Sequence, residues 1–204
     1  MPQYIIPCEA IAQHPDFRSL ASIAGLQVDL RYAGPDNFVG RPLYTGFDGA
    51  WLHREAAAGL ATAVTWLAQH RPGLTLLVLD ALRPHRVQIM LWEHLEGTGL
   101  RMYLADPARG SIHSFGKAVD VTLLDATGQE LDMGTGFDDL SERSHPALED
   151  QLLAAGQLTA AQLANRHLLR ETMLQAGFAG IRSEWWHFNH GDQELVRRQY
   201  GRVD

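Results

Sequence analysis

The stretch GSIHSFGKAVDVTL, residues 110–123, places His113 ahead of an apolar, β-rich run and Asp120 within it, seven positions later. Side chains of a regular strand alternate between its two faces, so an odd separation would point these two groups in opposite directions. A bend at residues 114–116 removes the conflict, because Gly116 accepts backbone conformations that are closed to other residues. The stretch therefore predicts a bend followed by a buried strand, with both polar groups facing one metal ion.

Helix and strand patterns alternate on the N-terminal side of this stretch. Apolar residues at helical spacing predict a helix over residues 54–70, which ends before Pro72-Gly73. Residues 74–80, LTLLVLD, form a short continuous apolar run that is typical of a strand covered on both faces. Pro84 suits the first position of a second helix, which Gly97 would close.

The alternation continues on the C-terminal side. Residues 117–125 predict a strand, and Thr159 with Gln162 forms a capping box for a long helix that Gly177 ends. Residues 181–190, IRSEWWHFNH, predict the last strand, a buried and central one. These patterns predict an α+β fold in a single domain over residues 1–204. Its helices would pack against a small, mostly antiparallel sheet whose strand order the sequence leaves open.

Composition excludes several classes of partner. The 204-residue chain is 46% hydrophobic and carries a formal charge of −7, so neither nucleic acid nor an anionic membrane is an expected partner. Cys8 is the single cysteine, which leaves histidines and carboxylates to build any metal site. The N-terminal MPQYIIPCEA lacks the features of a secretory signal, and no run approaches the about 18 apolar residues of a membrane span. We therefore expect a cytoplasmic protein; its oligomeric state stays open.

Two more polar residues lie in the aromatic stretch SEWWHF, residues 183–188. Glu184 and His187 need partners there, because an unpaired buried polar group costs a few kcal/mol. With His113 and Asp120, His187 completes a set of three nitrogen and oxygen donors. Three protein ligands are what a catalytic zinc site uses when it keeps one position for water. Glu184 is then free to act as a base.

Together these motifs resemble the D-alanyl-D-alanine dipeptidase family of zinc peptidases. The resemblance covers about residues 26–190 and includes the patterns S-x-H-x-x-G-x-A-x-D at residues 111–120 and E-x-x-H at residues 184–187. It implies a mixed α/β zinc-peptidase fold of the hedgehog and D,D-peptidase type, with one Zn²⁺ per chain. The supporting segments are LRYAGPDNFVGRPLY (30–44), LDALRPHR (79–86) and MGTGFDDLSERSH (133–145).

The resemblance also implies a role for each matched residue. His113, Asp120 and His187 would bind zinc, with Glu184 as the general base. Arg83 would stabilise the transition state and Asp80 would orient it; the alternative is that Arg83 merely bridges Asp80. The remaining matched residues would hold the free ammonium of a dipeptide substrate: Ser111 and Asp138, with help from Tyr32. Phe115 departs from the family, in which arginine is common at this position.

The implied reaction is hydrolysis of D-alanyl-D-alanine to two D-alanines by a zinc-activated water. The biological purpose stays open between protection against glycopeptide antibiotics and recycling of D-alanine. Two alternatives remain. One is a D,D-carboxypeptidase or endopeptidase that acts on peptidoglycan peptides with the same ligands. The other is a zinc-binding protein without turnover, which the presence of Glu184 disfavours because a purely structural site needs no base.

Overall fold

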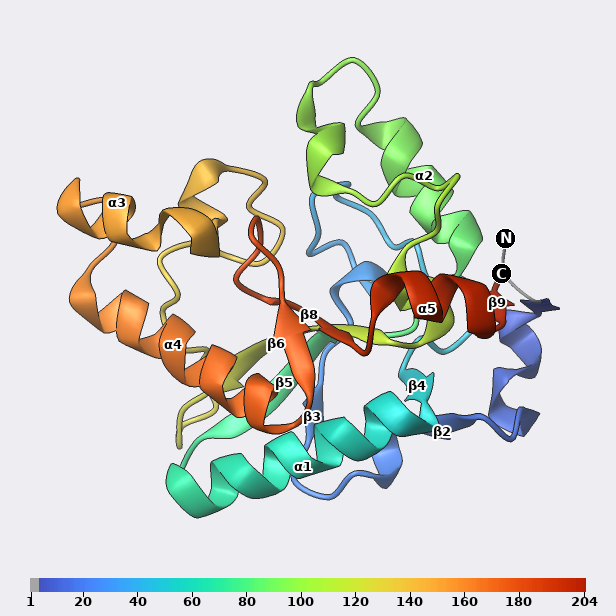
Figure 1. The fold of residues 1–204 in the computed structure, drawn as a ribbon, viewed down its shortest axis with the longest axis horizontal. Coiled ribbons are helices and arrows are strands. Elements are labelled where there is room, and N and C mark those ends of the chain that lie inside the picture. Colours follow the sequence, from blue (N-terminus) through green and yellow to red (C-terminus); the bar gives the residue numbers. More distant parts are fainter. Residues whose placement is uncertain (1–3) are drawn as a thin grey trace.

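The computed structural model describes residues 4–204, so the first three residues of the N-terminal stretch MPQYIIPCEA lie outside it. Figure 1 shows a central sheet with helices beside it. The helices are α1 (Arg54–His70), α2 (His85–His94), α3 (Glu149–Ala154), α4 (Ala160–Gln175) and α5 (Gln193–Gln199). The strands are β1 (Ile5–Ile6), β2 (Phe17–Ser19), β3 (Gln27–Val28), β4 (Trp51–His53), β5 (Thr75–Asp80), β6 (Ala118–Leu124), β7 (Phe178–Gly180), β8 (His187–His190) and β9 (Arg202–Val203).

The main sheet has five strands in the order β3-β5-β6-β8-β7. Only β3 and β5 run parallel; the other three neighbouring pairs are antiparallel. The expected α+β fold with a small, mostly antiparallel sheet is therefore confirmed. Two further pairs, β1 with β9 and β2 with β4, form small separate sheets.

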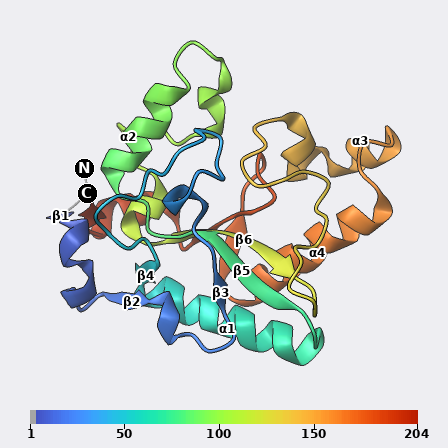
Figure 2. The same cartoon turned by 180° about the vertical axis from the view of Figure 1, so that it is seen from behind.

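Strand β6 divides the molecule into a packed side and a site side. Val119, Val121 and Leu123 are fully buried in the main apolar core, which also contains residues of α1 and α4. Because strand side chains alternate, Asp120 points to the opposite face. Seen from behind in Figure 2, β5 and β6 lie in front of α1 and α4. The two long helices thus cover one face, and the other face is left to the loops that form the site.

Most of the predicted elements appear where the sequence places them. Helix α1 spans the predicted residues, and the Thr159–Gln162 capping box is present at the start of α4, which Gly177 follows with φ of 80°. Pro84 is the residue that precedes α2, not its first helical position, and α2 ends at His94, three residues before Gly97.

The last predicted strand is corrected in both length and position. Strand β8 begins only at His187, so Glu184 lies in an irregular segment before it, and β8 is second from the sheet edge instead of central. The pairing with β6 ends at Asp120 and His187, followed by a single bond from the Val121 N–H to the Trp186 carbonyl. The Trp185 indole N–H donates to Thr135 Oγ1 at 2.8 Å, so the side chain before β8 is bound outside the sheet.

Two C-terminal elements that the sequence analysis did not predict, α5 and β9, close the chain against its N-terminal part. Tyr200, which follows α5, donates a hydrogen bond to Glu55 on α1 at 2.8 Å. The same carboxylate oxygen accepts from the buried Lys117 ammonium at 2.6 Å. This network fixes α5 next to the bend at Gly116.

In residues 4–204 no helix has both the length and the apolar character needed to span a bilayer.

Candidate metal and substrate site

His113, Asp120 and His187 come together because three elements meet at one end of β6. His113 lies in a 3₁₀ turn, Ile112–Phe115, and Gly116 follows with φ of 62°, so the predicted bend is present. Asp120 lies on β6, directly paired with His187 at the start of β8. The turn places His113 on the same side of the sheet. We call these three residues the ligand trio.

The donor atoms of the ligand trio face one another. His113 Nε2 lies 3.2 Å from His187 Nδ1 and 3.4 Å from Asp120 Oδ1, and His187 Nδ1 lies 3.0 Å from Asp120 Oδ1. His113 and Asp120 are almost fully buried, and His187 is partly exposed. Burial alone would raise the pKa of Asp120, but the adjacent His113 and His187 hold it below its usual range.

Hydrogen bonds on the outer side of both rings leave lone pairs pointing inward. His113 Nδ1 lies 2.8 Å from the Ala81 carbonyl, which can only accept, so this nitrogen carries the proton. His187 Nε2 lies 3.0 Å from Asn189 Oδ1 and donates to it in the same way. In the neutral rings, two nitrogen lone pairs and a carboxylate oxygen then converge. Such a set repels itself without a cation and is the arrangement of a histidine-bound metal site.

The spacing also fits zinc. Tetrahedral ligands at about 2.0–2.1 Å from Zn²⁺ lie about 3.3 Å from one another. The three observed separations, from 3.0 to 3.4 Å, scatter around that value, so one ion could contact all three donor atoms. With two imidazoles and one carboxylate, the trio would supply three of the four coordination positions of a tetrahedral zinc ion.

Glu184 lies beside the ligand trio but is not one of its donors. Its Oε2 is 3.9 Å from His187 Nδ1, and the side chain is 11% exposed on the cavity wall. Burial raises the pKa of Glu184 to about 8, although the neighbouring His187 acts to lower it. A carboxyl group with a pKa near neutrality suits proton transfer in both directions.

Arg83 is held in place by hydrogen bonds from three of its nitrogens. Nε donates to Asp80 at 2.8 Å, Nη1 to Gln88 at 3.0 Å and Nη2 to Asp120 at 3.2 Å. Asp80 in turn accepts a hydrogen bond from the Tyr44 hydroxyl. Although burial opposes its charge, the adjacent Asp80 raises the pKa of Arg83 well above its ordinary value. Arg83 therefore contacts Asp80, as expected, but also reaches the ligand trio and the cavity.

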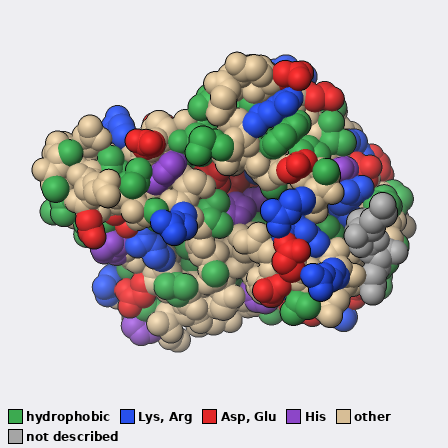
Figure 3. Space-filling view, turned by 45° about the horizontal axis from the view of Figure 1, so that its top comes forward, with side chains coloured by type: hydrophobic (Ala, Val, Ile, Leu, Met, Phe, Trp, Pro, Cys, Tyr) green, Lys and Arg blue, Asp and Glu red, His purple; other side chains and the backbone are tan. Residues whose placement is uncertain are grey.

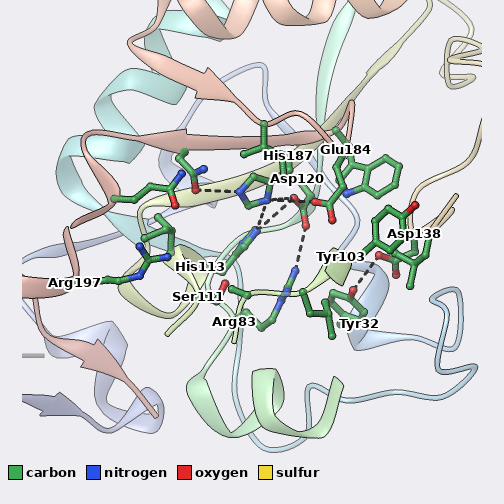
Figure 4. Close-up of a pocket in the computed structure, with 18 residues that line it drawn as sticks. Tyr32, Arg83, Tyr103, Ser111, His113, Asp120, Asp138, Glu184, His187 and Arg197 are labelled. Carbon is green, nitrogen blue, oxygen red and sulfur yellow. Dashed lines mark hydrogen bonds and ion pairs between the residues drawn. The ribbon is translucent and has the colours of Figure 1, made fainter. Parts of the chain in front are cut away.

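Asp138 and Tyr32 form a second polar pair on the cavity wall. The Tyr32 hydroxyl donates to Asp138 Oδ1 at 3.0 Å, and the Phe38 N–H donates to Oδ2 at 3.4 Å. Burial raises the pKa of Asp138 to about 7, against the opposing charge of Arg83. Figure 4 shows Asp138 on one side of the ligand trio and Ser111 on the other. All predicted site residues thus lie in one region, but Ser111 and Asp138 lie on different sides of the ligand trio.

All of the site residues predicted from the sequence except Asp80 line a single cavity of about 130 Å³. Figure 3 shows it as a hollow with acidic and histidine side chains at its floor. Pockets for drug-sized ligands are commonly about 300–1,000 Å³. The cavity is therefore matched to a small substrate.

Asn189 and Arg197 are polar cavity residues that sequence reasoning missed. Asn189, which fixes the ring of His187, could have been found, because it lies two positions along β8 and so faces the same side. Arg197 gave no comparable signal, because it lies on α5, a helix that the sequence analysis did not predict.

Comparison with known proteins identifies the family of this chain. A peptidase M15 family model described as D-ala-D-ala dipeptidase matches residues 15–204. A D-alanyl-D-alanine dipeptidase of Escherichia coli is 42% identical over 163 residues, which cover 80% of this chain and 78% of the relative. Proteins of the same name from Enterococcus faecium and Streptomyces coelicolor are 33% and 32% identical, covering 81% of this chain and 86% of each relative. The chain therefore belongs to the D-ala-D-ala dipeptidase family of metallopeptidases.

Proposed function

We propose that this protein hydrolyses D-alanyl-D-alanine to two D-alanines, with a zinc ion held by His113, Asp120 and His187. The observation that carries the proposal is the convergence of these three donors beside Glu184 on the wall of one small cavity. The similarity to D-alanyl-D-alanine dipeptidases supports this choice of substrate. When bound, zinc supplies Lewis acidity, which acidifies water and polarises a carbonyl oxygen. The cytoplasmic location and the single-domain organisation expected from the sequence stay predictions.

The protein's own residues divide the remaining work. Glu184 accepts a proton from the attacking water while the oxygen of that water bonds to the peptide carbonyl carbon. It then delivers that proton to the amide nitrogen as the C–N bond breaks, so one new carboxylate and one new amine result. Arg83, already fixed by Asp80 and Gln88, directs its charge at the oxygen that becomes negative. A preorganised donor of this kind is worth about 3 kcal/mol in the transition state.

Asp138 limits the length of the substrate at its amino end. We infer that the Asp138 carboxylate, held by the Tyr32 hydroxyl, binds the free ammonium of the dipeptide. A peptide extended or blocked at its nitrogen would leave this buried carboxylate without a cation, which is costly. The small cavity volume also disfavours longer peptides. Free dipeptides are therefore favoured over peptidoglycan chains.

The test is release of D-alanine by zinc-loaded protein. Wild-type protein should release it from D-Ala-D-Ala, and Glu184→Gln should be slower by about 10²- to 10⁴-fold while binding zinc in the same stoichiometry. Equal rates for the two proteins would remove Glu184 as the base. Absence of release by wild-type protein would refute the proposed function, and equal release from N-acetyl-D-Ala-D-Ala would indicate a carboxypeptidase.

A further inference from the structure

Arg197 projects from α5 into the same cavity, on the side away from Asp138 (Figure 4). Its Nε donates to the Gly110 carbonyl at 3.1 Å and its Nη1 to Glu194 at 2.9 Å, and the side chain is 14% exposed. Within residues 4–204, the third guanidinium nitrogen, Nη2, makes no hydrogen bond. Arg197 is thus anchored at two atoms and keeps one donor group free.

The charges around Arg197 leave it with a net positive character. Its acidic partner Glu194 is shared, because the same oxygen accepts from Arg109 at 2.8 Å. Glu194 is also 54% exposed, and an exposed ion pair of this kind holds its members weakly. An anion in the cavity can therefore compete for Arg197.

Ser111 adds an open polar group next to this position. Ser111 follows Gly110, the residue that accepts from Arg197, and it is 4% exposed. Its hydroxyl has no hydrogen-bond partner within the described part of the chain, and the side chain lines the cavity. The hydroxyl therefore faces the cavity with its donor and acceptor capacity unused, and it can donate to an anionic ligand bound there.

A dipeptide zwitterion demands one anion and one cation from its site. Asp138 provides the anion. Arg83 already pairs with Asp80 and Asp120, at 2.7 Å and 3.2 Å, and its proposed task is the oxygen of the scissile carbonyl, so the substrate carboxylate needs a second cation. Among the described residues that line the cavity, Arg197 is the other arginine or lysine. Arginine also matches the planar carboxylate group with parallel hydrogen bonds.

We propose that Arg197, with the Ser111 hydroxyl, binds the α-carboxylate of the substrate and makes the site specific for peptides with a free C-terminus. The inference rests on the proposed dipeptide substrate. It reassigns Ser111 from the ammonium end, where the family resemblance placed it, to the carboxylate end. With Asp138 at one end and Arg197 at the other, the cavity recognises both termini of a two-residue substrate.

The kinetic test compares D-Ala-D-Ala with its C-terminal amide in four proteins: wild type, Arg197→Met, Arg197→Lys and Arg198→Met. Wild-type kcat/KM should be about 10- to 100-fold higher for the free acid than for the amide. Arg197→Met should lose this preference by losing activity on the acid alone, and Arg197→Lys should retain part of it. Arg198 is the neighbouring exposed arginine, so Arg198→Met should behave as wild type.

A binding measurement separates this inference from the proposed function. The ketomethylene isostere of D-Ala-D-Ala, which has no peptide bond to cleave, is titrated calorimetrically onto zinc-loaded protein as the free acid and as the amide. Preference of wild type for the acid, lost in Arg197→Met, supports the assignment even if D-Ala-D-Ala is not hydrolysed. Hydrolysis of acid and amide with equal kcat/KM by wild type overturns the assignment and leaves the dipeptidase function intact. A preference for the acid that persists in a folded Arg197→Met protein also overturns it.

Discussion

Asp138 combines an unusual backbone conformation with a costly charge. Its φ of 61° is the single positive value at a non-glycine position in residues 4–204, a region that asparagine and aspartate tolerate better than other residues. Burial raises the pKa of Asp138 to about 7. In the folded protein this carboxyl group therefore holds its proton over a range in which the unfolded chain has already released it.

This difference in proton binding at Asp138 determines how the stability of the fold depends on pH. Between about pH 4 and pH 7 the folded state binds more protons than the unfolded state at Asp138, so the stability contributed by this group falls as pH rises and is lowest above pH 7. Asp138→Asn stays neutral and tolerates the same φ. The variant should gain stability relative to wild type as pH increases from 5 to 8, measured by urea unfolding, while its KM for D-Ala-D-Ala rises. The same stability difference at both pH values would contradict this account.

The residues of the site differ in how far the sequence could reveal them. His113, Asp120, Glu184 and His187 belong to short motifs whose spacing carries the chemistry, and the structure places them together. Arg197 approaches from a helix near the end of the chain, and its contact with Gly110 depends on tertiary packing. No local pattern encodes such a contact, so a sequence can show the reacting groups and still hide a group that binds the far end of the substrate.

At the scale of elements, Gly116 joins the turn that carries His113 to the strand that carries Asp120. Its φ is 62°, and a Cβ atom at this position would lie 2.7 Å from the His53 nitrogen and 2.7 Å from Phe17 Cε1. The first of these atoms is backbone and cannot move aside cheaply. Glycine is thus required at position 116 for two reasons: the backbone has a positive φ, and a Cβ atom has no room.

Gly116→Ala should destabilise the fold by about 2–4 kcal/mol, the combined cost of a left-handed alanine and of overpacking. Gly128 provides the matched control, because its φ is 83° but no atom lies within 4 Å of a built Cβ. Gly128→Ala should therefore show only the conformational cost, about 1–2 kcal/mol. Chemical denaturation of the three proteins measures both effects. Equal losses for the two variants would show that the close contact with His53 and Phe17 contributes nothing.

The elements that the sequence predicted well are those with strong local signals. Helix α1 has a continuous apolar stripe and a Pro-Gly stop, and α4 has a capping box. Strand β8 was predicted too long because Trp185 and Trp186 have high β propensity, yet their side chains pack into the core beside an irregular backbone. Tertiary packing overrides propensity at this point, and the irregular backbone is what brings Glu184 to the cavity.

At the scale of the whole molecule, the ligand trio joins segments that lie 67 and 74 positions apart in sequence. Without a cation, its three acceptors repel one another in the middle of the fold. A cation that binds the trio and not the unfolded chain must stabilise the folded state by mass action. The site is therefore also a structural connection between the turn before β6, β6 itself and β8.

Removal of zinc should accordingly lower the unfolding temperature. At free zinc about 1,000-fold above its dissociation constant the stabilisation is about 4 kcal/mol, which corresponds to about 8–16 °C for a chain of this length. Calorimetric scans with zinc and with a chelator measure the shift in wild type, His187→Gln and Glu184→Gln. His187→Gln should lose most of the shift because it removes a donor. Glu184→Gln should keep all of it, since Glu184 lies beside the trio without supplying a donor, and a loss of the shift in that variant would make Glu184 a ligand instead of the base.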